Sequence, residues 1–252
     1  GKRQMCIRDS AIGVHLTLTS EWSKYRWAPV NAEHTASLRD EEGYMWHESD
    51  QVEEHVDLDE VEGEIRAQIE RCKRLGLTNP SHLDNHMGSL YGIETGRFEL
   101  LELTLSLAGE YGLPFRFPGS FTEAQFNNTM LDINIDKSMI EMVFGKVVAF
   151  AKQQGVAIPD YLMPNEWNEP QTQSYEQFRE YLYDLYASIP EGVTETYLHP
   201  AKESDDLKGT SSVWERRVWE YRVMSDPATK QHIEAHGIKL INYRDLAAMR
   251  KA

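Results

Sequence analysis

The chain has 252 residues, of which 40% are hydrophobic and 27% are charged, as in a globular protein large enough for one extensive core. Its 41 acidic and 26 basic residues give a net charge of −15, which disfavours nucleic acid and other polyanions as partners. No apolar run approaches the roughly 18 residues that a membrane span needs, and no signal peptide is recognisable, so we expect a cytoplasmic protein without membrane contact.

Apolar and β-branched residues from Ala11 to Leu18 predict a buried strand that ends near His15. A glycine before that histidine permits close approach of the backbone to its neighbours. Residues 19–55 show little periodicity but carry five aromatic side chains: Trp22, Tyr25, Trp27, Tyr44 and Trp46. A long loop of this kind is usually functional, and its rings could stack on the C–H faces of a sugar. The alternative is that these rings cover the hydrophobic core.

Asp57 and Glu60 form a capping-box pattern at the start of a helix whose apolar positions recur up to the stop signal Gly76. Cys72 lies on the apolar face of that helix, which predicts a buried thiol. Cys6 and Cys72 are too few for a disulfide framework. Helical periodicity predicts further helices over residues 98–108, 136–154, 174–188, 212–224, 228–236 and 245–249.

Short apolar runs between these helices predict strands at 82–84, 114–117, 156–163, 193–198 and 238–241. Because strands alternate with helices, the sequence predicts an α/β fold with a parallel sheet. The count is about six strands, whereas a closed barrel has eight. The absence of repeats and linkers favours one domain over residues 11–252. Residues 1–10 differ in character from the rest, and we expect them to be foreign to the natural protein.

Histidines stand at the ends of three predicted strands, where a parallel barrel would bring distant residues together. His82, Asp84 and His86 alternate along the chain and would point to one side, which offers three candidate ligands for a divalent metal. His15 adds another candidate ligand. His199, held extended by the proline that follows it, is a candidate general acid or ligand. Each candidate also has a purely structural explanation. The side chains at 82, 84 and 86 could form local hydrogen bonds, His15 could be a buried core histidine, and His199 could cap the end of a strand.

Three segments carry a family resemblance: residues 13–19 (GVHLTLT), 80–88 (PSHLDNHMG) and 196–201 (TYLHPA). They resemble the motifs of the YdjC-like (ChbG/HpnK) carbohydrate deacetylases, and residues 239–245 (KLINYRD) are similar to the C-terminus of that family. Each motif alone is a weak signal, whereas their shared order and spacing are considerably more specific. The resemblance extends from about residue 11 to residue 244.

The resemblance implies a (β/α) TIM-barrel-like deacetylase fold and a divalent metal, Mg²⁺ or Zn²⁺, held by one aspartate and two histidines. By motif position the two histidine ligands are His15 and His86, and the catalytic acid is His199. His82 and Asp84 match motif residues that support the site.

The reaction implied by the resemblance is metal-dependent removal of acetyl groups from N-acetylated sugars or oligosaccharides. The metal polarises the acetamide carbonyl and activates water, an aspartate takes the proton of that water, and His199 protonates the departing amine. Arg116 matches the family only loosely, and we expect it to orient a catalytic carboxylate or to contact the saccharide.

One motif of the family has no counterpart here. Family members begin with an Asp-Asp-Phe-Gly motif on the first strand, which supplies the catalytic base and the third metal ligand. Only 14 residues precede His15, and the nearby Asp9 lies in an unrelated context. We therefore expect the first β-α unit to be missing, metal binding to be weak and activity to be impaired. An open sheet edge would also be available for pairing, which is compatible with a homodimer.

The sequence is also compatible with two other functions. The first is a non-catalytic carbohydrate-binding or regulatory relative that keeps the fold without the catalytic base. The second is a metal-dependent phosphoesterase that uses the same histidines, and the acidic charge and the lack of a glycine-rich phosphate loop make it the weaker of the two.

Overall fold

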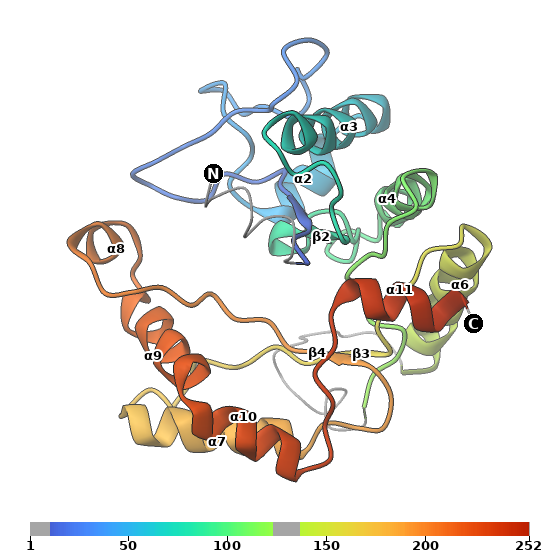
Figure 1. The fold of residues 1–252 in the computed structure, drawn as a ribbon. Coiled ribbons are helices and arrows are strands. Elements are labelled where there is room, and N and C mark those ends of the chain that lie inside the picture. The colour runs from blue at the N-terminus through green and yellow to red at the C-terminus, as the bar shows by residue number, and fades with distance from the viewer. Residues whose placement is uncertain (1–10, 123–136, 252) are drawn as a thin grey trace. The chain divides into compact units, whose positions relative to one another are not determined.

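The computed structural model describes residues 11–122 and 137–251 (Figure 1). The described chain forms two compact units: residues 11–120, 137–158 and 242–251 belong to the first, and residues 121–122 and 159–241 to the second. Each unit has a hydrophobic core of its own. Residues 1–10, which include Cys6 and Asp9, lie outside the described part of the chain. A single barrel domain over residues 11–252 stays a prediction.

The first unit is built on parallel pairing. Strand β1 (Val14–Leu16) pairs in parallel with β2 (Leu83–Asn85), and Leu83 forms a further parallel bridge with Phe115. The Phe115 amide in turn donates to the Ala157 carbonyl at 3.0 Å. Segments that follow one another along the chain therefore lie side by side in parallel, which confirms the predicted α/β arrangement. Closure into a barrel and the absence of a first β-α unit stay predictions.

Helices of the first unit begin and end where local chemistry allows it. Helix α3 (Leu58–Arg74) is capped by the Asp57 carboxylate, which accepts hydrogen bonds from the amides of Asp59 and Glu60. Gly76 takes a φ of +110° just beyond its end, as the stop signal predicts. The buried face of α3 includes Val61, Ile65 and Ile69. The other helices are α2 (Ser49–His55), α4 (Glu99–Glu110), α6 (Lys137–Gln153), α11 (Tyr243–Lys251) and the short 3₁₀ helix η1 (His86–Gly88).

The second unit contains strands β3 (Tyr161–Leu162) and β4 (Thr194–Glu195), which pair in parallel. Its helices are α7 (Tyr175–Ala187), α8 (Asp205–Thr210), α9 (Trp214–Ser225) and α10 (Pro227–Ala235). The Ser174 hydroxyl caps α7 by accepting from the Gln177 amide, and Phe178 and Leu182 are fully buried beneath it. The sequence predicted α7, α9 and α10 to within two residues at each end, whereas it did not predict α8 or the first-unit helix α2.

The strand predicted for residues 238–241 is wrong, because this segment is irregular. Ile238 packs on the core of the second unit, whereas Leu240 is 62% exposed. The Asn242 side chain then accepts hydrogen bonds from the amides of Arg244 and Asp245 at the start of α11. The apolar run therefore connects one unit to a helix of the other, and no strand of the described residues pairs with it.

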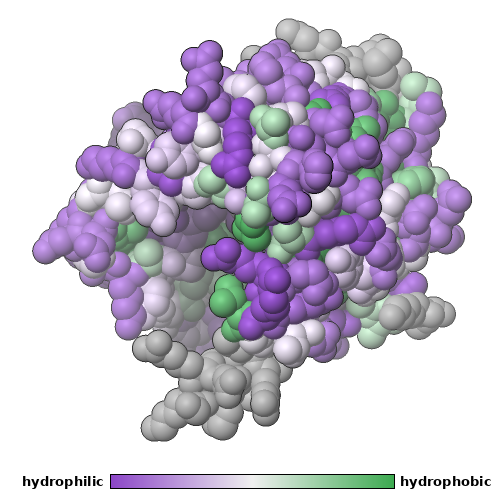
Figure 2. Space-filling view, turned by 90° about the horizontal axis from the view of Figure 1, so that it is seen from above, coloured by the Kyte–Doolittle hydropathy of each residue, from purple (hydrophilic) through white to green (hydrophobic). Residues whose placement is uncertain are grey.

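The surface agrees with the charged composition. Figure 2 shows hydrophilic side chains over most of one face, with hydrophobic side chains scattered among them. Within the described residues, every helix is too short or too polar to cross a lipid bilayer.

Candidate functional site

The pairing of β1 with β2 places His15 directly beside Asp84. His15 Nδ1 lies 3.0 Å from one carboxylate oxygen of Asp84, and Arg116 Nη1 lies 2.7 Å from the other. The three residues come from three adjacent parallel segments, so the sheet itself brings them together. Arg116 therefore contacts the carboxylate that holds His15, whereas its expected contact with a catalytic carboxylate or with the saccharide stays a prediction.

The charge state of Asp84 decides which nitrogen of His15 carries a proton. Burial alone would raise the pKa of Asp84, but the hydrogen bond from His15 and the charge of Arg116 outweigh it and lower that pKa below its usual value. An ionised carboxylate can only accept a hydrogen bond, so Nδ1 of His15 is the protonated nitrogen. In the neutral ring, Nε2 of His15 then presents a lone pair.

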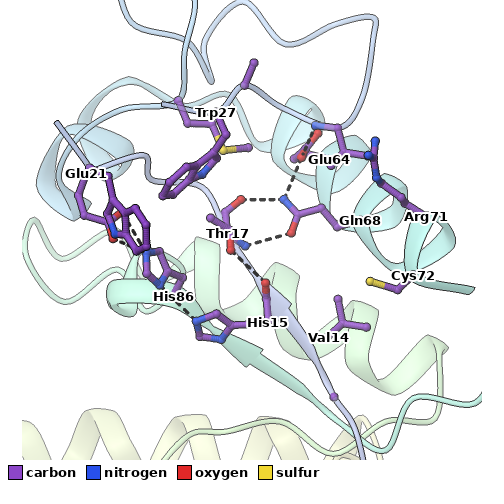
Figure 3. A pocket seen from close by; sticks show the side chains of 15 residues that line it. Val14, His15, Thr17, Glu21, Trp27, Glu64, Gln68, Arg71, Cys72 and His86 are labelled. Carbon is purple, nitrogen blue, oxygen red and sulfur yellow. Dashed lines mark hydrogen bonds and ion pairs between the residues drawn. The ribbon is translucent and has the colours of Figure 1, made fainter. Parts of the chain in front are cut away.

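His86 follows β2 at the start of η1 and turns its ring toward His15. His86 Nδ1 lies 3.2 Å from His15 Nε2, while His86 Nε2 lies 3.1 Å from both carboxylate oxygens of Glu21. Figure 3 shows this succession from Glu21 through His86 to His15. Glu21 was not predicted, because it lies in a segment without periodicity and its one signal is an acidic residue shortly after a strand.

The donor atoms of this pair fit two coordination positions of a divalent metal. Two nitrogens bound at about 2.0–2.1 Å to one tetrahedral ion lie about 3.3 Å apart, close to the 3.2 Å between His15 Nε2 and His86 Nδ1. Among residues 11–122 and 137–251, no set of three or more His, Cys, Asp or Glu side chains is arranged as a metal site. The described chain therefore offers two nitrogen ligands and no complete ligand set.

His82 has a different environment from the other histidines of the site. Its ring stacks on Tyr243 of α11, with ring centroids 3.8 Å apart, and its Nδ1 lies 2.8 Å from the Ser81 hydroxyl. A Cβ atom at Gly13 would lie 2.4 Å from His82 Cε1, so only glycine fits there. The close approach predicted for the glycine before His15 is therefore confirmed, and His82 is what approaches it.

Replacing Gly13 with alanine is expected to displace the His82 ring from Tyr243 and to lower the free energy of unfolding by about 1–3 kcal/mol. Gly145 is the matched control, because it lies on α6 with open space around its Cβ position. Gly145→Ala is expected to raise the free energy of unfolding by about 0.5–1 kcal/mol. Urea denaturation measures both, and a Gly13→Ala variant as stable as the parent would contradict this packing.

His82 also predicts how stability depends on pH. Burial, reinforced by the charges of Arg116 and His15 and opposed by Asp84, lowers the pKa of His82 to about 4. The unfolded chain takes up a proton near pH 6.5, whereas folded His82 does not until about pH 4, so stability falls as the pH drops through this window.

As the pH is lowered from 7 to 5, His82 is expected to lower the free energy of unfolding by about 2 kcal/mol. Urea denaturation in metal-free buffer at the two pH values measures the loss in the parent and in His82→Asn. The variant is expected to lose about 2 kcal/mol less than the parent. Equal losses in both would show that His82 is not kept neutral by its surroundings.

A pocket of about 490 Å³ opens beside the His15–His86 pair, and Glu21 and Gln68 are among its lining residues (Figure 3). Trp22 also lines this pocket. Cys72 lines it as well. This thiol is only partly buried, less than predicted, and its burial raises its pKa.

Some aromatic rings of residues 19–55 cover the hydrophobic core, and others are accessible at the pocket. Trp27 and Trp46 pack against the core, and their indole N–H groups donate to the carbonyls of Thr19 and Ser37. These two rings cover the core, as the structural alternative proposed. Trp27 also lines the pocket, and Trp22 is 36% exposed there, which makes the Trp22 ring accessible to a ligand.

His199 belongs to the second unit, and its backbone is held by a buried network. Its amide donates to the carboxylate of fully buried Glu220 at 2.7 Å, and Arg216 donates to the other oxygen of Glu220 at 2.9 Å. Arg216 also bonds Asn165, whose side-chain amide donates to the carbonyl of Tyr197. The main chain at 197–199 is thus fixed on both sides, while the catalytic role of His199 stays a prediction.

The chain is similar in sequence and in structure to known proteins. The chain matches the family described as YdjC-like protein over residues 2–235. It is 31% identical to a carbohydrate deacetylase of Enterococcus faecalis over 239 residues, which is 94% of this chain and 78% of that protein. A carbohydrate deacetylase of Thermus thermophilus is 37% identical over 107 residues, 42% of this chain and 37% of that protein. The crystal structure of an Enterococcus faecalis protein named for cellobiose-phosphate cleavage superposes with a TM-score of 0.68 and 30% identity, covering 97% of this chain and 82% of that chain.

Proposed function

This chain belongs to the YdjC-like protein family, and on that premise we propose that it is a carbohydrate deacetylase, a hydrolase that releases acetate from N-acetylated sugars or oligosaccharides. The relatives that carry this name support the proposal, since the Enterococcus faecalis protein is similar over nearly the whole of this chain. The observation that carries it is the convergence of His15 Nε2 and His86 Nδ1 beside a pocket of about 490 Å³.

We propose that these two histidines hold a divalent metal ion. When bound, such an ion polarises the acetamide carbonyl and lowers the pKa of water. Imidazole ligands suit Zn²⁺ better than Mg²⁺, which prefers oxygen, so Zn²⁺ is the better match to this pair. Because the described residues supply only two ligands, the affinity is expected to be low.

The remaining steps depend on side chains of this chain. Asp84 holds the His15 ring in the tautomer that presents the Nε2 lone pair. Trp22 at the pocket offers a ring face for the sugar. An amide nitrogen leaves only when it is protonated, and His199 is the proposed donor of that proton. Glu220 accepts from the His199 amide and so fixes the backbone that carries this imidazole.

The test is acetate release from N-acetylglucosamine and N-acetylchito-oligosaccharides at millimolar Zn²⁺ or Mg²⁺. Acetate and free amine are expected in equal amounts, and chelation of the metal is expected to stop the release. If every N-acetyl sugar stays intact with either metal while the protein still binds the sugars, the deacetylase proposal fails and a carbohydrate-binding role replaces it.

A further inference from the structure

Glu21 is the acidic residue of the candidate site that contacts His86. It lies six residues beyond His15 in an irregular segment, yet its side chain is only 22% exposed and both of its oxygens lie 3.1 Å from His86 Nε2. Surface ion pairs of glutamate seldom fix a single geometry. A partly buried carboxylate centred on one ring nitrogen fixes the orientation of that ring.

Each of the two histidines has a carboxylate on its outer nitrogen, which is the ring nitrogen that points away from the other histidine. Asp84 accepts from the outer nitrogen of His15, and Glu21 accepts from the outer nitrogen of His86. A carboxylate on each outer nitrogen requires a proton there, and in the neutral rings this leaves lone pairs on both inner nitrogens, 3.2 Å apart. Two lone pairs at that distance repel each other unless a proton or a metal cation lies between them.

We propose that Glu21 is a positioning residue that fixes the His86 tautomer with a proton on Nε2, and thereby sets the affinity of the histidine pair for a divalent cation. Glu21 is not itself a ligand of that cation, because its oxygens contact Nε2, whereas the nitrogen that faces His15 is Nδ1. The inference rests on the proposed function insofar as it concerns a metal. The tautomer itself can be measured without one.

The main experiment compares Zn²⁺ affinity by calorimetry in four proteins: the parent, Glu21→Gln, Glu21→Leu and the control Glu54→Gln. The leucine variant is expected to bind Zn²⁺ about 10–100-fold more weakly, the usual cost of losing a hydrogen-bond partner behind a metal-bound histidine. The glutamine variant keeps a carbonyl oxygen that can accept the N–H, so its affinity is expected to lie between those of the parent and the leucine variant. Glu54 is exposed on α2, and Glu54→Gln removes the same charge as Glu21→Gln. The Zn²⁺ affinity of Glu54→Gln is therefore expected to equal that of the parent.

A second readout keeps the inference testable without metal or turnover. Nitrogen NMR of the imidazole rings is expected to show His86 protonated at Nε2 in the metal-free parent and in Glu21→Gln, and a mixture of tautomers in Glu21→Leu. Unchanged Zn²⁺ affinity and an unchanged tautomer in Glu21→Leu would overturn the proposal. An equal loss of affinity in Glu54→Gln would overturn it too, since the effect would then be long-range charge. Failure of acetate release with this ranking intact would reject the deacetylase and keep the role of Glu21.

Discussion

Replacing His86 with alanine is expected to reduce Zn²⁺ affinity and metal-dependent acetate release by at least about 100-fold each, since loss of a ligand costs no less than loss of the group behind it. His15→Ala is expected to behave in the same way, because the two rings supply the two inner nitrogens. Calorimetry with Zn²⁺ and an enzymatic acetate assay measure the two quantities.

The matched control for these variants is His236→Ala. His236 is an exposed histidine at the end of α10 in the second unit, so its removal tests for nonspecific binding of metal by surface imidazoles. We expect affinity and rate to stay within about twofold of the parent there, in line with the small effects of surface substitutions. Retention of full metal affinity in both His15→Ala and His86→Ala would refute the ligand assignment.

Removing the Asp84 side chain is expected to give the largest loss of stability at the site, about 3–5 kcal/mol, as when one partner of a buried ion pair is deleted. The Asp84 and Arg116 side chains are only 10% and 16% exposed, so water compensates poorly for the lost carboxylate. The same carboxylate orients His15, so metal affinity is expected to fall as well. Urea denaturation and calorimetry measure the two effects.

A double variant separates these two consequences. In Asp84→Ala combined with Arg116→Leu, the buried guanidinium is gone, so part of the lost stability is expected to return. Metal affinity is not expected to return, because His15 still lacks its carboxylate. If Asp84→Ala alone costs less than about 1 kcal/mol, the value typical of exposed ion pairs, the pair does not stabilise the sheet as described.

The pairing of His15 with His86 could be predicted from the sequence, because both follow strand-like runs and parallel strands end at one edge. Helix α3 and its cap could be predicted, since Asp57 caps the first turn of the helix and Gly76 lies just beyond its last turn. These signals are local or periodic, and neither depends on distant contacts.

Other features depend on contacts that no local pattern encodes. The contact of Glu21 with His86 joins residues 65 positions apart, and the segment around Glu21 has no periodicity to place it. The run at residues 238–241 has strand-like composition, but a strand also needs a free edge to pair with. The stacking of His82 on Tyr243 likewise joins the two ends of the first unit, which only the folded chain brings together.

The central claim is that His15 and His86 hold one divalent cation. A crystal structure of the protein with Zn²⁺ tests it most directly, through the anomalous signal of the metal. The predicted result is one ion at about 2.0–2.1 Å from both His15 Nε2 and His86 Nδ1, with Asp84 and Glu21 still on the outer nitrogens. A metal-loaded crystal in which the ion binds elsewhere, and the two rings keep their direct 3.2 Å contact, would contradict the claim.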